Sequence, residues 1–125
     1  MRNSLLALAL ALPVAALAQN GPPVVEVRLS SFDFDPATIR LRAGQPIVLR
    51  LTNTGSGGHN FAAPQFFAAA AIVEGQGVPI RDGAIEVGSR QTVSVRLTPA
   101  RGTYRLRCTH TMHSMFGMRG EIVVE

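Results

Sequence analysis

Apolar residues occupy every second position through most of the chain after residue 20. In 38–44, Ile39 and Leu41 alternate with Arg40 and Arg42. The same pattern recurs in the segments 24–30, 46–53, 90–98, 102–108 and 120–125. Such alternation is typical of strands with one buried face, and Gly-, Pro- and Asn-rich stretches separate them. Six or more short strands predict an all-β domain, an antiparallel Greek-key sandwich or barrel.

One segment, 64–75, breaks this pattern. It begins with Pro64, is rich in alanine and stops at Gly75. Proline is favoured in the first turn of a helix, and glycine is favoured just after the last turn. We therefore expect one helix of two or three turns here, with Phe66 and Phe67 on its apolar face.

The first eighteen residues have the features of a secretory signal peptide. A positively charged start is followed by an apolar run, and the small residues of 16–18 precede Gln19. The run is too short to span a membrane, although a retained anchor is the alternative. We expect cleavage near Ala18 and Gln19, which leaves residues 19–125 as a single domain in the periplasm or otherwise exported, without membrane insertion.

The charge pattern excludes nucleic acid as a partner. Lys and Arg together number 12, all of them arginine, against 8 Asp and Glu. The arginines alternate along strands, as at Arg105 and Arg107, which is typical of a solvated sheet face. Because no basic cluster is interleaved with aromatic residues, a nucleic-acid surface is not indicated. A mildly basic surface favours an acidic protein partner only weakly.

The chain contains one cysteine, Cys108. An exported protein with one cysteine forms no internal disulfide, and an accessible thiol is open to oxidation there. Three roles remain: an intermolecular disulfide, an inert buried thiol or a metal-bound thiolate. The residues around Cys108 favour the metal-bound thiolate, since two of the three histidines and three of the four methionines lie within 107–120.

The spacing of Cys108, His113 and Met118 indicates copper. They follow one another at intervals of five residues, in a loop between a strand that ends at Cys108 and a last strand that begins near Gly120. Only a curling loop brings residues five apart together. A trigonal His₂Cys set with a weak axial Met is a blue-copper electron-transfer site. A zinc site is expected to avoid methionine.

Such a site needs a second histidine, and His59 is the candidate. It follows the strand 46–53 and a glycine-rich turn. If that strand lies beside the strand ending at Cys108, His59 reaches the same end of the sandwich. A histidine in such a loop is, taken alone, typical of a solvated surface. Beside a Cys-x₄-His-x₄-Met loop it becomes a candidate ligand.

The two segments resemble those of the cupredoxins, the small type 1 blue copper proteins of the plastocyanin and pseudoazurin kind. The segment 32–61, with its P-x-x-I strand start and final HNF, resembles the N-terminal half of that family, and 104–124 resembles its Y-x-x-x-C-x₄-H-x₄-M-x-G ligand loop. The resemblance covers nearly the whole mature chain. It implies one type 1 copper with three equatorial ligands and one axial ligand: His59, Cys108, His113 and the axial Met118. It also implies that Asn60 ties the two ligand segments together by hydrogen bonds.

The loop departs from the family pattern. Thr111 and Met112 stand where many relatives carry Pro-Gly, and His110, Met112 and Met115 are additional potential ligands. A rival set of Cys108, His110 and Met115 places only one residue between Cys and His, shorter than the family's loops.

The extra soft side chains allow three interpretations. Met112, Met115 and Phe116 form an apolar rim that shields the copper and docks a redox partner. Alternatively, His110, Met112 and Met115 bind an auxiliary Cu(I), which thioethers select. A third interpretation is that crowding in the loop alters the main site without adding a metal.

We therefore expect a soluble one-electron carrier, not an enzyme, that is monomeric and passes electrons through the edge of His113. Its partner would be a cytochrome, an oxidase or a reductase. The alternative is a copper-binding, copper-tolerance or copper-delivery protein that uses the extra His and Met residues. A copper-free module is disfavoured by the complete ligand set, and a binuclear copper centre would need two cysteines.

Overall fold

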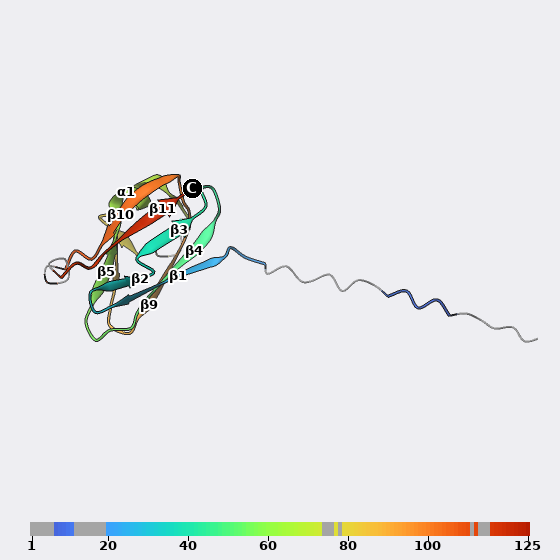
Figure 1. Cartoon of the computed structure of the whole chain (residues 1–125), viewed down its shortest axis with the longest axis horizontal. Coiled ribbons are helices and arrows are strands. Elements are labelled where there is room, and N and C mark those ends of the chain that lie inside the picture. Colours follow the sequence, from blue (N-terminus) through green and yellow to red (C-terminus); the bar gives the residue numbers. More distant parts are fainter. Residues whose placement is uncertain (1–6, 12–19, 74–76, 78, 111, 113–115) are drawn as a thin grey trace, which may run out of the picture.

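The strands form two sheets that face each other as a sandwich (Figure 1). The computed structural model describes residues 7–11, 20–73, 77, 79–110, 112 and 116–125. The first sheet has the strand order β2-β1-β4-β9-β6. Its strands are β1 (Val24–Ser30), β2 (Asp33–Asp35), β4 (Ile47–Asn53), β6 (Ala71–Ile72) and β9 (Thr92–Thr98).

The second sheet carries the segments in which the candidate ligands were predicted. Its strand order is β3-β11-β10-β5-β8-β7. Its strands are β3 (Thr38–Leu41), β5 (His59–Ala62), β7 (Ile80–Arg81), β8 (Ala84–Val87), β10 (Gly102–Arg107) and β11 (Arg119–Val124). The all-β sandwich predicted from the sequence is confirmed.

The sheets are mixed and not purely antiparallel, which corrects one part of the prediction. β1 pairs with β4 in parallel, and β3 pairs with β11 in parallel. The reason lies in the connection from β2 to β3. β2 runs antiparallel to β1, and only two residues later the chain continues as β3 in the other sheet. The chain then returns as β4 in the direction of β1.

The predicted alternation sets the two faces of the strands. Leu29, Leu49 and Leu51 are almost completely buried, and Ile39 and Ile122 face the same core from the second sheet. Polar residues between them lie on the outer faces. Each fully buried side chain of this size stabilises the fold by about 1.5–3 kcal/mol.

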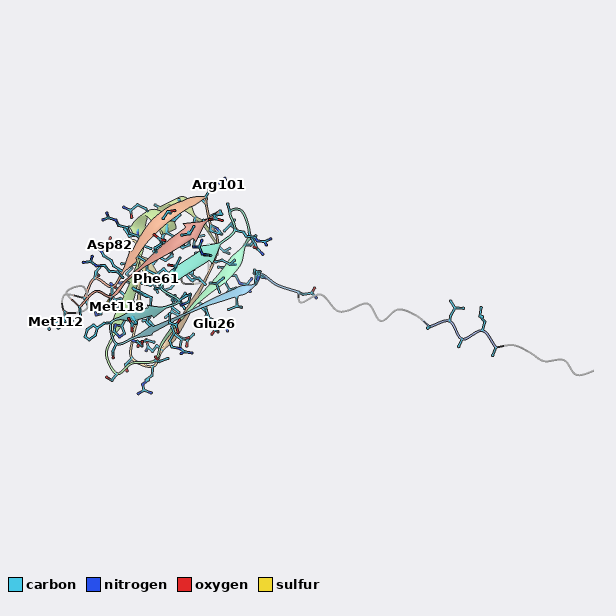
Figure 2. The ribbon with its side chains drawn as sticks, viewed as in Figure 1. Glu26, Phe61, Asp82, Arg101, Met112 and Met118 are labelled. Carbon is cyan, nitrogen blue, oxygen red and sulfur yellow. The ribbon has the colours of Figure 1, made fainter. Side chains whose placement is uncertain are left out.

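The helix α1 (Pro64–Ala69) is shorter than the predicted segment 64–75. Backbone pairing ends it, since Ala70 is extended and the next two residues form β6 against β9. Phe66 and Phe67 are buried as expected. Phe67 packs on Phe61, whose ring centroid is 5.9 Å away. Phe61 itself lies between the sheets (Figure 2). Gly75 lies outside the described residues.

No helix among the described residues has the length and apolar character needed to cross a membrane. Leu8 and Leu10, in the N-terminal segment, are 80% and 79% exposed. Residues 7–11 lie away from the sandwich in Figure 1.

Gly120 is the position at which we test the packing of the second sheet. A Cβ at Gly120 would lie 2.5 Å from the carbonyl oxygen of Ala37, which precedes β3. We therefore expect Gly120→Ala to destabilise the metal-free domain by about 1–3 kcal/mol, because β3 and β11 must separate. Urea unfolding measures the change. Gly57→Ala is the control, since nothing lies within 4 Å of its Cβ position. Equal stability of the two variants would contradict the packing described here.

Candidate metal centre

Cys108 and Met118 lie opposite each other at one end of the sandwich, which we call the site pole. The antiparallel ladder of β10 and β11 pairs Arg107 with Arg119. One residue further, the Cys108 amide donates a hydrogen bond of 3.1 Å to the Met118 carbonyl. Both side chains have 0% exposure. The ladder thus brings a thiol and a thioether ten residues apart in sequence into the same buried end of the core.

His59 reaches the site pole by a different route from the one expected. That route requires the strand 46–53 to lie beside the strand ending at Cys108, and this condition is not met, because β4 belongs to the other sheet. His59 instead begins a strand of its own, β5, which lies between β10 and β8. The pairing of Ala62 with Arg107 directs the start of β5 toward the site pole. His59 is 3% exposed, and so it is not a solvated loop residue.

Asn53 holds the glycine-rich turn that leads to His59. Its side-chain amide donates to the carbonyls of Gly57 and Val87, at 2.8 and 3.0 Å. Its Oδ1 accepts the amide of Gly55 at 2.9 Å. A Cβ on Gly55 would lie 3.5 Å from Nε2 of His59, so the turn passes close to the imidazole. Sequence reasoning missed Asn53, although its position at the end of a strand before a Gly-rich turn was a usable signal.

Asn60 joins the two segments that carry the candidate ligands. Its backbone amide lies 3.5 Å from Sγ of Cys108 and donates to it. Its side-chain Oδ1 accepts the Thr109 amide at 2.8 Å, and its Nδ2 donates to Oγ1 of Thr109 at 2.7 Å. The residue is 3% exposed. Three contacts from one residue therefore fix the position of the Cys108 sulfur relative to β5.

Glu86 extends this network to the surface. Its Oε1 accepts a hydrogen bond of 3.1 Å from Nδ2 of Asn60, and its Oε2 lies 3.1 Å from Nε2 of His110. The carboxylate thus lies between the strand β5 and the first part of the loop. Nothing in the local sequence around Glu86 indicated this role, because β8 meets the loop only in the folded sheet.

Met112 and Phe116 of the loop lie at the outer rim of the site pole. Met112 is 59% and Phe116 is 62% exposed, and the Phe116 amide donates to the Met112 carbonyl at 3.2 Å. The Phe116 ring packs on Phe32, with centroids 5.0 Å apart. His113 and Met115 lie outside the described residues.

Among the residues that the structure describes, no three His, Cys, Asp or Glu side chains are grouped as a metal site. Within this part of the chain, His59 and Cys108 are the members of the predicted ligand set that belong to these residue types. Met118 adds a thioether to them.

Comparison with known proteins assigns the family. Residues 4–124 match the model of the cupredoxin-like domain. The chain belongs to the cupredoxin-like family. The resemblance of the chain to the cupredoxins is thereby confirmed, and the match extends over both sheets of the sandwich.

Solved cupredoxin structures share this fold. Auracyanin B is 25% identical, with a TM-score of 0.63 over 86% of this chain and 93% of its own. Auracyanin A of Chloroflexus aurantiacus, a "blue" copper protein, is 23% identical, with a TM-score of 0.57 over 84% of this chain and 100% of its own. The multicopper oxidase McoA of Aquifex aeolicus shares the fold at 15% identity and a TM-score of 0.63, over 90% of this chain but 31% of its own. A search of curated proteins found no match to this sequence.

Asn60→Ala tests whether this residue holds the loop. We expect the amide of Thr109 to exchange its hydrogen about tenfold faster or more, because it loses a part-buried acceptor. Hydrogen exchange of the metal-free domain measures this change. The Cys108 amide, bonded to Met118, is the internal reference and should change little. Glu26→Ala, which removes a largely exposed carboxylate from the first sheet, is the control variant. Unchanged exchange at Thr109 in Asn60→Ala would contradict this role.

Proposed function

We propose that this protein is an exported one-electron carrier that binds a single copper ion at the site pole. The observation that carries the proposal is the buried Cys108, which lies opposite Met118 and accepts a hydrogen bond from Asn60. The proposed equatorial ligands are His59, Cys108 and His113, and the proposed axial ligand is Met118.

The chemistry of the described donors fits copper. A thiol, a thioether and an imidazole, all buried, come from β5 and from the two ends of the loop. Soft sulfur ligands together with imidazole suit copper, whereas a methionine disfavours zinc. Cys108 is the chain's only cysteine, so no competing internal disulfide can remove the thiol. The auracyanins, of which auracyanin A is described as a blue copper protein, support the same assignment.

Copper in such a site supplies a one-electron couple between Cu(I) and Cu(II). The protein's own residues hold the donors in fixed positions. Asn60 fixes the sulfur through its backbone amide and fixes Thr109 through its side chain. Asn53 fixes the turn beside His59. Hydrogen-bonded partners of this kind orient ligands and tune a metal site, and their loss typically lowers metal affinity about 10–100-fold.

The exposed rim of the loop supports the proposal that the copper transfers electrons to a partner protein. Met112 and Phe116 are large apolar side chains at the surface of the site pole, and Phe32 packs beside Phe116. Exposed methionine and aromatic side chains are enriched where proteins meet partners. We propose that this rim contacts a protein redox partner and shields the metal from water. No substrate-converting role is proposed.

We further propose that residues 1–18 are a signal peptide and that 19–125 form the mature domain in the periplasm or outside the cell. The exposure of Leu8 and Leu10 supports this proposal, since neither packs into the domain.

Cys108→Ser tests the copper site most simply. Cu(II) added to the purified mature domain should give an intense thiolate-to-copper absorption band in the visible range, and the variant should lack it. Serine preserves the size of the side chain and an acceptor for the Asn60 amide, so the fold should be retained. A nitrogen-15 amide spectrum checks this. A wild-type domain without the band, or a variant that keeps it, would exclude the proposed site.

Metal stoichiometry separates an electron carrier from a copper-handling protein. We expect one Cu(I) per chain under reducing conditions, with the same value in Met112→Leu/Met115→Leu. The exposed position of Met112 and the contact of His110 with Glu86 support this expectation. A second copper that is lost in the double variant would instead favour copper binding or delivery through the auxiliary residues.

A further inference from the structure

The outer faces of β10 and β11 carry a cluster of arginines directly beside the site pole. Arg107 and Arg119 lie opposite each other in the antiparallel ladder, and Arg105 is two residues along β10 on the same face. All three are exposed. Like charges directly opposite each other on a sheet are destabilising, so this pair works against the stability of the strands that carry it.

These arginines line a cleft, which we call the arginine cleft. Its walls are formed by β10 and β11 on one side and by Ala62, Pro64 and Gln65 on the other. The charged residues that line it are Arg105, Arg107 and Arg119, and no acidic residue among the described ones lines it.

No ion pair within the described part of the chain neutralises the cleft. The ion pairs found there join Arg40 to Glu125 and Arg50 to Glu26, and the carboxylate of Glu86 contacts His110. Glu121 lies opposite Arg105 in the ladder but forms no ion pair with it. The acidic residues Asp82 and Glu86 line a separate, adjoining hollow, with Arg107 at the boundary. The positive charge of the cleft is therefore available to an external anion.

The cleft is also directly adjacent in sequence to two of the proposed copper ligands. Arg107 precedes Cys108, and Arg119 follows Met118. The pair of Arg107 and Arg119 is thus directly adjacent to the pair of Cys108 and Met118, and the two pairs are about 3.4 Å apart along the strands. The inner face of these strand ends buries the sulfur atoms, while the outer face presents the arginines.

We propose that the arginine cleft docks the acidic face of a protein redox partner. Guanidinium groups bind carboxylates through paired hydrogen bonds, and three of them in a row suit several carboxylates on one surface. Exposed charges of this kind act mainly on the association rate and on its salt dependence. The redox nature of the partner rests on the proposed function, whereas the preference for an acidic partner rests on the cleft alone.

The first experiment uses metal-free protein, so that its outcome is independent of copper. The nitrogen-15-labelled mature domain is titrated with a blocked heptapeptide of aspartate at low ionic strength, and heptalysine serves as the opposite-charge peptide. We expect shifts of the backbone amides of 105–107 and 119–121 and of the arginine Nε–H groups with the acidic peptide only. The binding should weaken as salt is added.

Matched variants distinguish the effect of the cleft on peptide binding from the effect of the net charge of the protein. Arg105→Gln/Arg107→Gln/Arg119→Gln should weaken binding of the acidic peptide about tenfold, because three exposed charge contacts are lost. The control, Arg42→Gln/Arg96→Gln/Arg101→Gln, removes the same charge from exposed positions away from the cleft. Arg101 lies far from the site pole (Figure 2). Equal weakening in the two triple variants, or no binding by the wild type, would overturn the proposal.

The copper-loaded protein then tests whether the arginine cleft affects electron transfer. Reduction by the anion hexacyanoferrate(II) should be about tenfold slower in the cleft variant than in the control variant, for the same electrostatic reason. Equal rates in the two variants would overturn the cleft as a route of electron entry.

Discussion

The geometry of the site pole depends on the contacts that Asn60 makes between β5 and the start of the loop. Among the described residues, the two candidate ligand segments meet where β5 lies against the end of β10, and the pair of Ala62 and Arg107 defines their strand register. Beyond that pair, the Asn60 amide and side chain bind Cys108 and Thr109. These contacts hold the sulfur near the His59 strand. A fixed frame of this kind would suit the proposed copper ion, which changes charge without a change of its surroundings.

The sequence predicted which face of each strand is buried, but it did not predict which strands pair with each other. Alternation in segments such as 38–44 predicts which side chains are buried, because strand periodicity is a local property. It does not say which strands pair, since pairing depends on contacts far apart in the sequence. For this reason the sequence left open whether the strand 46–53 lies beside the strand ending at Cys108, and it did not predict the parallel pairing of β1 with β4. The helix was overestimated because alanine favours a helix locally, while pairing with β9 made the next residues a strand.

The candidate site also contains residues that the sequence predicted and residues that it did not. The residue types and spacing of Cys108 and Met118 pointed to one end of the sandwich, and the β10–β11 ladder brings them together there. The supporting residues were harder to predict. Glu86 acts through contacts 24–26 residues away in sequence, so no local pattern reveals it. Asn53 was detectable only in part, since its contacts with Gly55 and Gly57 are local but its contact with Val87 is 34 residues away. The arginines were interpreted as a solvated face, and only the strand register places Arg107 opposite Arg119 beside a cleft.

We propose that one copper ion is bound by the Cys108 sulfur together with His59, His113 and Met118. X-ray absorption at the copper edge of the Cu(II)-loaded mature domain tests it most directly, because it identifies the atoms bonded to the metal. We expect one short bond to a thiolate sulfur and two bonds to imidazole nitrogens, with the sulfur bond absent in Cys108→Ser. A spectrum of the wild-type protein with only nitrogen and oxygen neighbours would contradict it.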